Sequence, residues 1–134
     1  MSELTAVVFD DEELFHVLLT RIFKSYKINV KCYPKPDLYF CMQPGVEKCP
    51  VDSPCVDFLL TDQKMPDMTG LEFLRRIKQM DCKILDDRKA IISGNWVDED
   101  LEVANKLVRN VFVKSEAKEL IGRWIEKFNN SPVS

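Results

Sequence analysis

Short runs rich in β-forming residues alternate with helical patterns along the whole chain. The β-rich runs are 4–10, 28–33, 56–62, 89–94 and 111–114. The helical patterns are 11–27, 37–42, 69–80, 98–110 and 115–130. Strands separated by helices are usually joined by right-handed crossovers, so this alternation predicts an α/β fold, a doubly wound parallel sheet with helices on both faces.

The spacing of apolar residues predicts which helix faces are buried. In the first helix, Leu14, Phe15, Leu18, Ile22 and Tyr26 recur at helical spacing and are expected to face the core. The same spacing marks Leu71, Leu74 and Ile77 in the third pattern, and Leu120, Ile121, Trp124, Ile125 and Phe128 in the last.

The size and charge of the chain narrow its class. A length of 134 residues with 46% hydrophobic residues suits one domain with a core of its own, which we expect to span 1–130, with 131–134 as a tail or the start of a linker. A net charge of -3 with mixed signs argues against direct nucleic-acid binding. No apolar run reaches bilayer length and the first residues do not resemble a signal peptide, so we expect a soluble, cytoplasmic protein without membrane contact.

Charged and hydroxyl side chains end several of the predicted strands. The first strand ends at Asp10 and Asp11, the third at Asp62, the fourth at Ser93 and the fifth at Lys114. Each residue alone is more simply a turn residue, a helix cap or a solvated charge. The carboxyl ends of parallel strands meet at one edge of the sheet, where α/β folds bind their ligands, so the joint placement indicates a site.

This set of side chains favours a particular chemistry. Close carboxylates repel one another unless a cation neutralises them, and a cluster of hard oxygen atoms suits Mg²⁺. A carboxylate neutralised in this way can attack phosphorus and become an aspartyl phosphate. Lys114 and the Ser93 hydroxyl are suited to stabilise the phosphoryl oxygens. The residues therefore predict phosphoryl transfer to Asp62.

The sequence resembles a response-regulator receiver domain, the phosphoacceptor module of two-component signalling. The resemblance is carried by "VVFDDEE", "LLTDQKMPDMTGLEFL", "IISG" and "VFVK", and it covers nearly the whole chain. It implies a flavodoxin-like five-stranded sheet of strand order 2-1-3-4-5. It also implies a phosphoprotein that takes its phosphoryl group on Asp62 from a histidine kinase or a phosphotransfer protein. Such a protein is not an enzyme, although it assists its own phosphorylation and dephosphorylation.

The resemblance also assigns roles to the residues around Asp62. It implies that Asp10 and Asp11 serve the Mg²⁺ ion, together with Asp62 and the backbone carbonyl of Lys64. The Ser93 hydroxyl is expected to sense the phosphoryl group, and Lys114 is expected to be its counter-ion. Phosphorylation would then change a surface for a downstream protein target, formed by the fourth helix, fifth strand and fifth helix (98–110, 111–114 and 115–130).

Two other classes remain open. A pseudo-receiver would serve as an interaction module that never carries phosphate, but the complete set of acceptor residues favours the switch. A phosphohydrolase with a nucleophilic aspartate, as in the haloacid dehalogenase group, needs a second carboxylate two positions after the nucleophile in the first strand. Glu12 only loosely imitates that carboxylate.

The sequence departs from the receiver pattern near Lys114. Many receivers carry an aromatic residue three positions before this lysine, where this chain has Val111 with Phe112 beside it. The aromatic ring of the usual coupling to the hydroxyl is therefore missing at this position. Most receivers have proline after the lysine, often across a cis bond, but here Ser115 follows, so we expect a trans bond.

Histidine and cysteine side chains offer a few further candidate ligands. The five cysteines form an odd set without a CxxC pair, which fits reduced thiols. The stretch 34–57 is longer than receivers usually need and reads as a shortened helix with an elaborated loop. It holds Cys41, Cys49 and Cys55, whose spacing matches no standard zinc knuckle and which have no evident fourth partner, so buried or idle thiols are favoured over zinc. We expect His16 on the solvent side of the first helix, as a surface residue.

Overall fold

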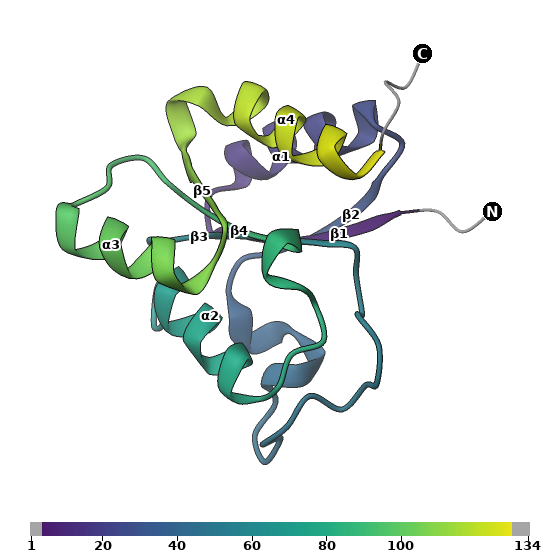
Figure 1. Cartoon of the computed structure of the whole chain (residues 1–134), viewed down its shortest axis with the longest axis vertical. Coiled ribbons are helices and arrows are strands. Elements are labelled where there is room, and N and C mark those ends of the chain that lie inside the picture. Colours follow the sequence, from purple (N-terminus) through teal and green to yellow (C-terminus); the bar gives the residue numbers. More distant parts are fainter. Residues whose placement is uncertain (1–3, 130–134) are drawn as a thin grey trace.

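The computed structural model describes residues 4–129, in which five parallel strands lie in the order β2-β1-β3-β4-β5 (Figure 1). The strands are β1 (Thr5–Phe9), β2 (Asn29–Tyr33), β3 (Phe58–Asp62), β4 (Lys89–Ser93) and β5 (Asn110–Val113). Every residue of β3 and β4 is buried, as expected for central strands that are covered on both faces. The predicted fold class and strand order are confirmed.

Two layers of helices cover the sheet (Figure 1). The helices α1 (Glu13–Ser25) and α4 (Ala117–Asn129) lie on one face, and α2 (Gly70–Gln79) and α3 (Asp98–Leu107) lie on the other. Successive strand residues point to opposite faces, so each strand contributes to both cores. Val8, Leu60 and Ile92 belong to the core under α1 and α4, and Val7, Leu59 and Ile91 belong to the core over α2 and α3.

The register of the strands brings their carboxyl ends to one edge. Phe9 pairs with Thr61, so the residues that follow them, Asp10 and Asp62, lie at the same level on neighbouring strands. On the other side of β3, Asp62 pairs with Ile92 of β4. Backbone hydrogen bonding of the central strands therefore fixes where the candidate residues meet.

The helix predicted at 37–42 does not form as an α-helix. The structure has two single 3₁₀ turns there, η1 (Pro36–Leu38) and η2 (Phe40–Met42), separated by Tyr39 in an extended conformation. The ring of Tyr39 is buried and packs edge-on against Phe9 at a centroid distance of 5.2 Å. Burial of this aromatic side chain outweighs the weak local preference for helix, so the described residues contain four α-helices rather than five.

The predicted buried face of the first helix is partly wrong. Leu19, Ile22 and Phe23 are the buried residues of α1, whereas Leu14 is 87% exposed and Leu18 is 39% exposed. The helix has apolar residues on more than one side, so periodicity alone does not decide which side meets the sheet. The predictions for the other two helices are confirmed, because Leu71, Leu74 and Ile77 are buried, as are Ile121, Trp124 and Ile125, with Leu120 and Phe128 packed against the core.

Three further predictions concern membrane-spanning helices, the C-terminal tail and the bounds of the last two helices. No helix in the described part of the chain combines the length and apolarity needed to cross a membrane. The predicted tail at 131–134 lies outside the described residues. The helices that were expected fourth and fifth are α3 and α4 of the structure, each beginning and ending within a few residues of its predicted range.

Candidate functional site

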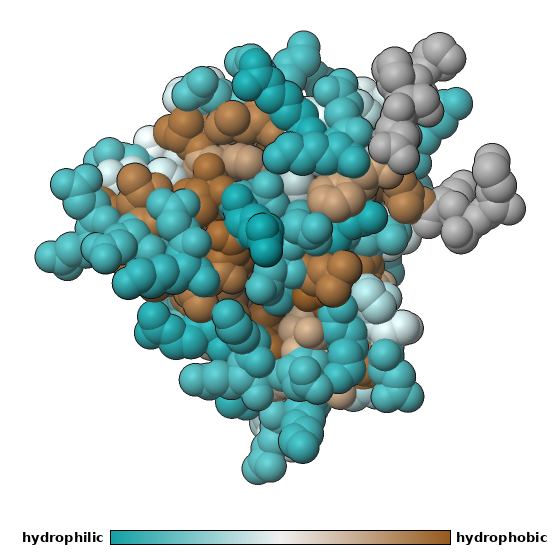
Figure 2. Space-filling view, viewed as in Figure 1, coloured by the Kyte–Doolittle hydropathy of each residue, from teal (hydrophilic) through white to brown (hydrophobic). Residues whose placement is uncertain are grey.

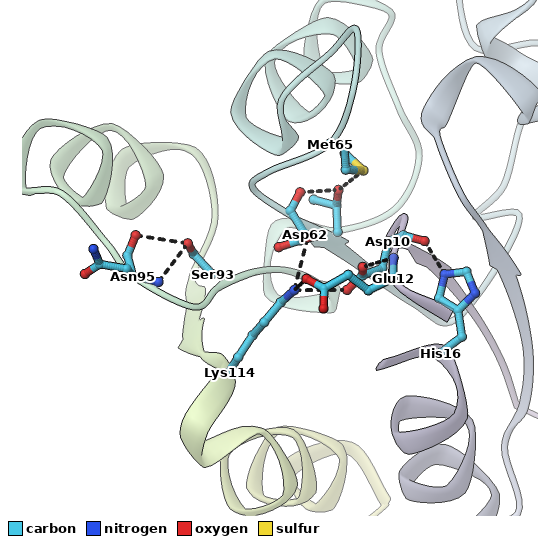
Figure 3. A network of polar contacts seen from close by, with 9 residues as sticks. Asp10, Glu12, His16, Asp62, Met65, Ser93, Asn95 and Lys114 are labelled. Atoms are coloured by element: carbon cyan, nitrogen blue, oxygen red, sulfur yellow. Dashed lines mark hydrogen bonds and ion pairs between the residues drawn. The ribbon is translucent and has the colours of Figure 1, made fainter. Parts of the chain in front are cut away.

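Asp62 ends the central strand β3 and lies at the middle of the candidate site (Figure 3). Its side chain is 2% exposed, and its Oδ2 atom accepts a hydrogen bond of 3.1 Å from the Lys114 ammonium group. A carboxylate in this position is held rigidly by the strand while its oxygen atoms meet groups from other strand ends. Such a group is suited to act as a nucleophile.

Three carboxylates gather at this edge of the sheet. Asp10, Asp11 and Asp62 each offer an oxygen atom, and these atoms lie within 4.8 Å of one another. The backbone N–H of Glu12 donates a 2.8 Å hydrogen bond to Asp10 Oδ1. The other oxygen, Oδ2, is buried and accepts no hydrogen bond, although it lies 3.5 Å from the Lys114 ammonium. A buried carboxylate oxygen without a donor, beside two further carboxylates, fits a site for a hard divalent cation.

Lys114 follows β5 and brings positive charge to the cluster. Besides Asp62, its Nζ atom contacts Glu12 Oε1 at 3.0 Å. The ammonium also lies 4.6 Å above the ring of Phe15 from α1, at cation-π distance. Figure 3 shows the lysine side chain extending between Asp62 and Glu12. Three carboxylates and one ring therefore hold this ammonium in place.

The electrostatics of the cluster resist full ionisation. Burial and, next to it, the charge of Asp10 raise the pKa of Asp62 to about 6, although Lys114 offsets part of the shift. Burial likewise raises the pKa of Asp10. Burial lowers the pKa of Lys114, but its hydrogen bond to Glu12 and the charges of Asp62 and Asp10 outweigh that effect and raise it overall. More positive charge would stabilise the ionised carboxylates, as a bound divalent cation does.

The segment after Asp62 is tightly organised. The side chain of Gln63 accepts a 2.9 Å hydrogen bond from the Leu71 N–H at the start of α2. Thr69 and Glu72 form a reciprocal capping box at the same helix end. Gly70 approaches the strand so closely that a Cβ atom there would lie 2.3 Å from the Asp62 carbonyl oxygen. The Thr69-Gly70 step thus locks the start of α2 against the strand that carries Asp62.

Ser93 lies at the same edge, but its hydroxyl is engaged elsewhere. The Ser93 Oγ atom donates a 3.2 Å hydrogen bond to the Asn95 carbonyl and lies 3.3 Å from the Asn95 N–H. Figure 3 shows the side chain directed toward Asn95 rather than toward Asp62. The structure therefore places Ser93 near the cluster without a hydrogen bond between this hydroxyl and the carboxylates.

The aromatic residues near Lys114 differ from the receiver pattern as expected. Val111 is half-buried, while the ring of Phe112 points to the opposite face of the sheet and packs against Trp124. Trp96, three residues after Ser93, donates a 2.8 Å hydrogen bond from its indole N–H to the Phe112 carbonyl. No peptide bond among the described residues is cis, which confirms the trans bond expected after Lys114.

Several groups around the acidic cluster were not expected from the sequence. Glu12 pairs with Lys114, and its place two residues after Asp10 could have indicated this. The expectation for His16 is wrong, because the ring is half-buried and its Nε2 atom contacts the Asp10 carbonyl (Figure 3). The helix turns His16 back toward the end of β1, which the sequence spacing does not reveal. The Lys64 side chain is exposed, and the role of its carbonyl as a metal ligand stays a prediction.

Comparisons with known proteins find the fold but not a close relative. No family model matches the sequence, and no curated protein matches it. Solved structures do match over nearly the full length. The receiver domain of the response regulator NarL from Mycobacterium tuberculosis superposes with a TM-score of 0.73 at 17% identity, covering 98% of this chain and 99% of that one. The FixJ-N crystal structure matches with a TM-score of 0.72 at 24% identity, covering 100% and 99%. The beryllofluoride-activated DrrB receiver domain matches with a TM-score of 0.73 at 14% identity, covering 97% and 100%.

These likenesses, together with the strand order, show that the chain has the fold of response-regulator receiver domains. At this level of identity they concern the fold alone.

Proposed function

We propose that this chain is a phosphoacceptor receiver domain of a two-component system, with Asp62 as the phosphorylated residue. The observation that carries the proposal is the buried cluster at the sheet edge, where Lys114 contacts Asp62 and Asp10 and Asp11 lie beside them. Structural elements far apart in sequence converge to make it. A single turn residue at a strand end would not require such a convergence.

The residues have complementary tasks in the proposed reaction. An oxygen atom of Asp62 attacks phosphorus in a phosphohistidine of the donor protein. The new P–O bond forms as the donor P–N bond breaks, and the electron pair of that bond leaves with the imidazole. Lys114 already touches Asp62 and is placed to pair with the transferred oxygens. The rigid strand end keeps the nucleophile in line for this displacement.

The acidic cluster fits Mg²⁺ as the cofactor. Asp10, Asp11 and Asp62 would hold the ion, and the Lys64 carbonyl is the further ligand that we propose. When bound, Mg²⁺ supplies the positive charge that lets a carboxylate cluster accept an anionic phosphoryl group. The structural feature that favours this assignment is the buried Oδ2 atom of Asp10, which accepts no hydrogen bond.

The proposed output surface is the face formed by α3, β5 and α4. Figure 2 shows apolar side chains gathered over β5, between these two helices. Val103 and Leu107 of α3 and Val111 and Val113 of β5 are only half-buried. The hydrogen bond from Trp96 to the Phe112 carbonyl joins the loop after Ser93 to this face. A phosphoryl group that attracts the Ser93 hydroxyl would disturb that loop and so alter the surface offered to a downstream protein.

A second function, a phosphorylation-independent interaction module, has two specific observations in its favour. The Ser93 hydroxyl is bonded to Asn95, and the place of the usual aromatic reporter is taken by Val111. A receiver that had lost its response would keep the fold and the surface without the switch. The proposed experiment separates the two functions.

Phosphorylation of the purified chain by acetyl phosphate tests the proposal directly. We expect intact-protein mass spectrometry to detect one added phosphoryl group, and beryllofluoride to bind in its place, only when Mg²⁺ is present. Asp62→Asn should abolish both results because the nucleophile is removed, and Asp11→Ala should abolish them because the cation site is incomplete.

Asp67→Asn is the matched control for this experiment. Asp67 is an exposed aspartate in the same segment, outside the acidic group, so its replacement should leave phosphorylation intact. If the wild-type chain gains no phosphoryl mass and binds no beryllofluoride with saturating donor and Mg²⁺, the switch is excluded and the interaction module is the better reading.

A further inference from the structure

Four cysteines that are scattered in sequence line one small cavity beneath α2. Cys41, Cys49 and Cys55 come from the long connection between β2 and β3, and Cys82 follows the end of α2. The rest of the lining is aromatic and aliphatic, including Tyr39. The three loop cysteines have no evident fourth partner in sequence, and the fold brings Cys82 to the same cavity.

Two hydrogen bonds tie the loop that carries Cys49 to α2 and to the residue that follows it. The N–H of Cys49 donates a 2.7 Å bond to the Met80 carbonyl, two residues before Cys82. The side chain of Arg76 donates a 3.2 Å bond to the Val46 carbonyl, which ties the same loop to α2.

The loop that carries two of these cysteines has little else to hold it. Residues 43–57 contain no helix or strand, and none of them is buried. A long irregular segment in a compact domain loses much conformational entropy on folding, and apolar burial offsets that loss only where side chains leave the solvent. A cross-link to the rest of the domain would explain how such a segment keeps one conformation.

A buried cation, the ammonium group of Lys89, lies near the cavity that the four cysteines line. The Lys89 side chain is 5% exposed, and its ammonium meets the half-exposed carboxylate of Asp86 only at 3.5 Å. Lys89 pairs in register with Leu59 of β3, and Leu59 lines the cavity. Buried charges are normally paired, so this lysine is suited to face a group of net negative charge.

We propose that Cys41, Cys49, Cys55 and Cys82 form a structural zinc site that fastens the loop 43–57 to the end of α2. Four thiolates complete the tetrahedral coordination of Zn²⁺ and leave no open position, which is the pattern of structural rather than catalytic zinc. Binding releases the four thiol protons and gives a site of net charge -2, which Lys89 partly offsets. The inference does not depend on the phosphoacceptor function of Asp62.

The size of the cavity favours a single ion over a larger cofactor. Its volume is about 10 Å³, which is about the space of one water molecule and too small for an iron–sulfur cluster. Among residues 4–129, the acidic group alone has its ligand atoms all within 4.8 Å of one another, so zinc would draw the sulfur atoms inward. Cys55 is exposed and its sulfur is hydrogen-bonded to the Tyr39 hydroxyl at 2.9 Å, so this side chain would exchange that bond for the metal.

Metal analysis of the purified chain tests the proposal. We expect one zinc ion per chain after purification under reducing conditions with zinc present, and replacement by Co²⁺ should give the visible absorption of tetrahedral thiolate coordination. Cys49→Ser and Cys82→Ser should each lose stoichiometric zinc. Cys32→Ser is the matched control, because Cys32 lies in β2 outside the cavity and its loss should leave the zinc in place.

Limited proteolysis of the wild-type chain covers the case in which a cysteine variant fails to fold. Lys48 is exposed in the loop, so trypsin should cut after it severalfold faster once a zinc-selective chelator is added in the presence of Mg²⁺. Failure of the reduced wild-type chain to bind zinc or Co²⁺ would overturn the proposal. So would iron in place of zinc, disulfide bonds among the four cysteines under reducing conditions, or full zinc occupancy in both Cys49→Ser and Cys82→Ser.

Discussion

Asp62 is held in an environment that disfavours its own charge. Its side chain is almost fully buried, Asp10 lies beside it, and Lys114 is the one positively charged side chain among residues 4–129 that forms an ion pair with it. Strong perturbation of a carboxyl group in a cluster of charged side chains is typical of functional sites. The free protein therefore tolerates a local electrostatic cost at the residue that we propose as its nucleophile.

This cost should appear as a dependence of stability on pH. The pKa of Asp62 is raised to about 6 in the folded chain, so the folded state binds the proton more tightly than the unfolded state does. Asp62 therefore destabilises the fold progressively between about pH 4 and pH 6, and the penalty is fully present above that range. We expect Asp62→Asn, measured by urea unfolding in EDTA, to gain stability relative to wild type by up to about 3 kcal/mol between pH 4 and pH 7.

The quantity to compare is the difference in the free energy of unfolding between Asp62→Asn and wild type. The contributions of the other titrating groups largely cancel in this difference. Asp67→Asn, on the exposed part of the same segment, should show no such change with pH relative to wild type. A difference between Asp62→Asn and wild type that stays constant from pH 4 to pH 7 would contradict the electrostatic cost assigned to Asp62.

The placement of individual residues could be predicted from the sequence where backbone topology decides it. Asp62 ends one parallel strand and Asp10 and Lys114 follow two others, and the carboxyl ends of such strands meet whatever the side chains are. The direction of the Ser93 hydroxyl depends on a side-chain rotation and on the turn at Asn95, which carry no pattern in sequence. The contact of His16 with the Asp10 carbonyl likewise depends on how α1 is turned against the sheet.

At the scale of elements, α2 is fixed at its first residue. The Gly70 N–H donates a 3.0 Å hydrogen bond to the Gln63 carbonyl, and the glycine backbone lies against the end of β3. The capping box and the Gln63 side chain satisfy N–H groups that a helix start leaves without partners. The position of α2 and the position of Asp62 are therefore coupled through this one contact.

Substitution of Gly70 should uncouple them. In Gly70→Ala the new Cβ would meet the Asp62 carbonyl oxygen at 2.3 Å, and backbone must shift to relieve the contact. We expect a loss of roughly 1–3 kcal/mol in the free energy of unfolding, despite the better helix propensity of alanine, together with slower phosphorylation because Asp62 is displaced.

Gly94→Ala is the control for this prediction, since it lies at the same edge of the sheet. Its added Cβ would meet only the Lys114 side chain, at an ordinary contact distance of 3.9 Å. Urea denaturation of both variants makes the comparison. Equal stability of Gly70→Ala and Gly94→Ala would show that the close approach at Gly70 does not matter.

The connection 34–57 shows where prediction of elements from sequence failed. Local propensity allowed a helix at 37–42, but Tyr39 is extended so that its ring can pack against Phe9 and Tyr33. Cys82 is separated from the other cavity cysteines by β3 and α2, so no spacing rule could join it to them. Long-range packing decides both features, and a single sequence does not reveal it.

At the scale of the whole molecule, the central sheet joins two hydrophobic cores. Each central strand contributes alternate residues to both, so neither core can be disrupted without exposing the other side of the same strands. The chain has one tryptophan associated with each core. Trp124 is buried under α1 and α4, and Trp96 packs against the core on the side of α2 and α3.

This arrangement predicts that the two layers unfold together. In Trp96→Phe, fluorescence reports only Trp124 and hence the layer of α1 and α4, whereas in Trp124→Phe it reports only Trp96 and the opposite layer. The first change removes the hydrogen bond to the Phe112 carbonyl and should cost about 1 kcal/mol. The second removes a buried indole and its hydrogen bond to the Asp87 carbonyl, and should cost more.

In each variant the urea midpoint from fluorescence should equal the midpoint from far-UV circular dichroism, because a shared sheet makes unfolding cooperative. If the Trp96 signal changes at lower urea than the circular dichroism does, the layer of α2 and α3 opens by itself and the two cores are not one cooperative unit.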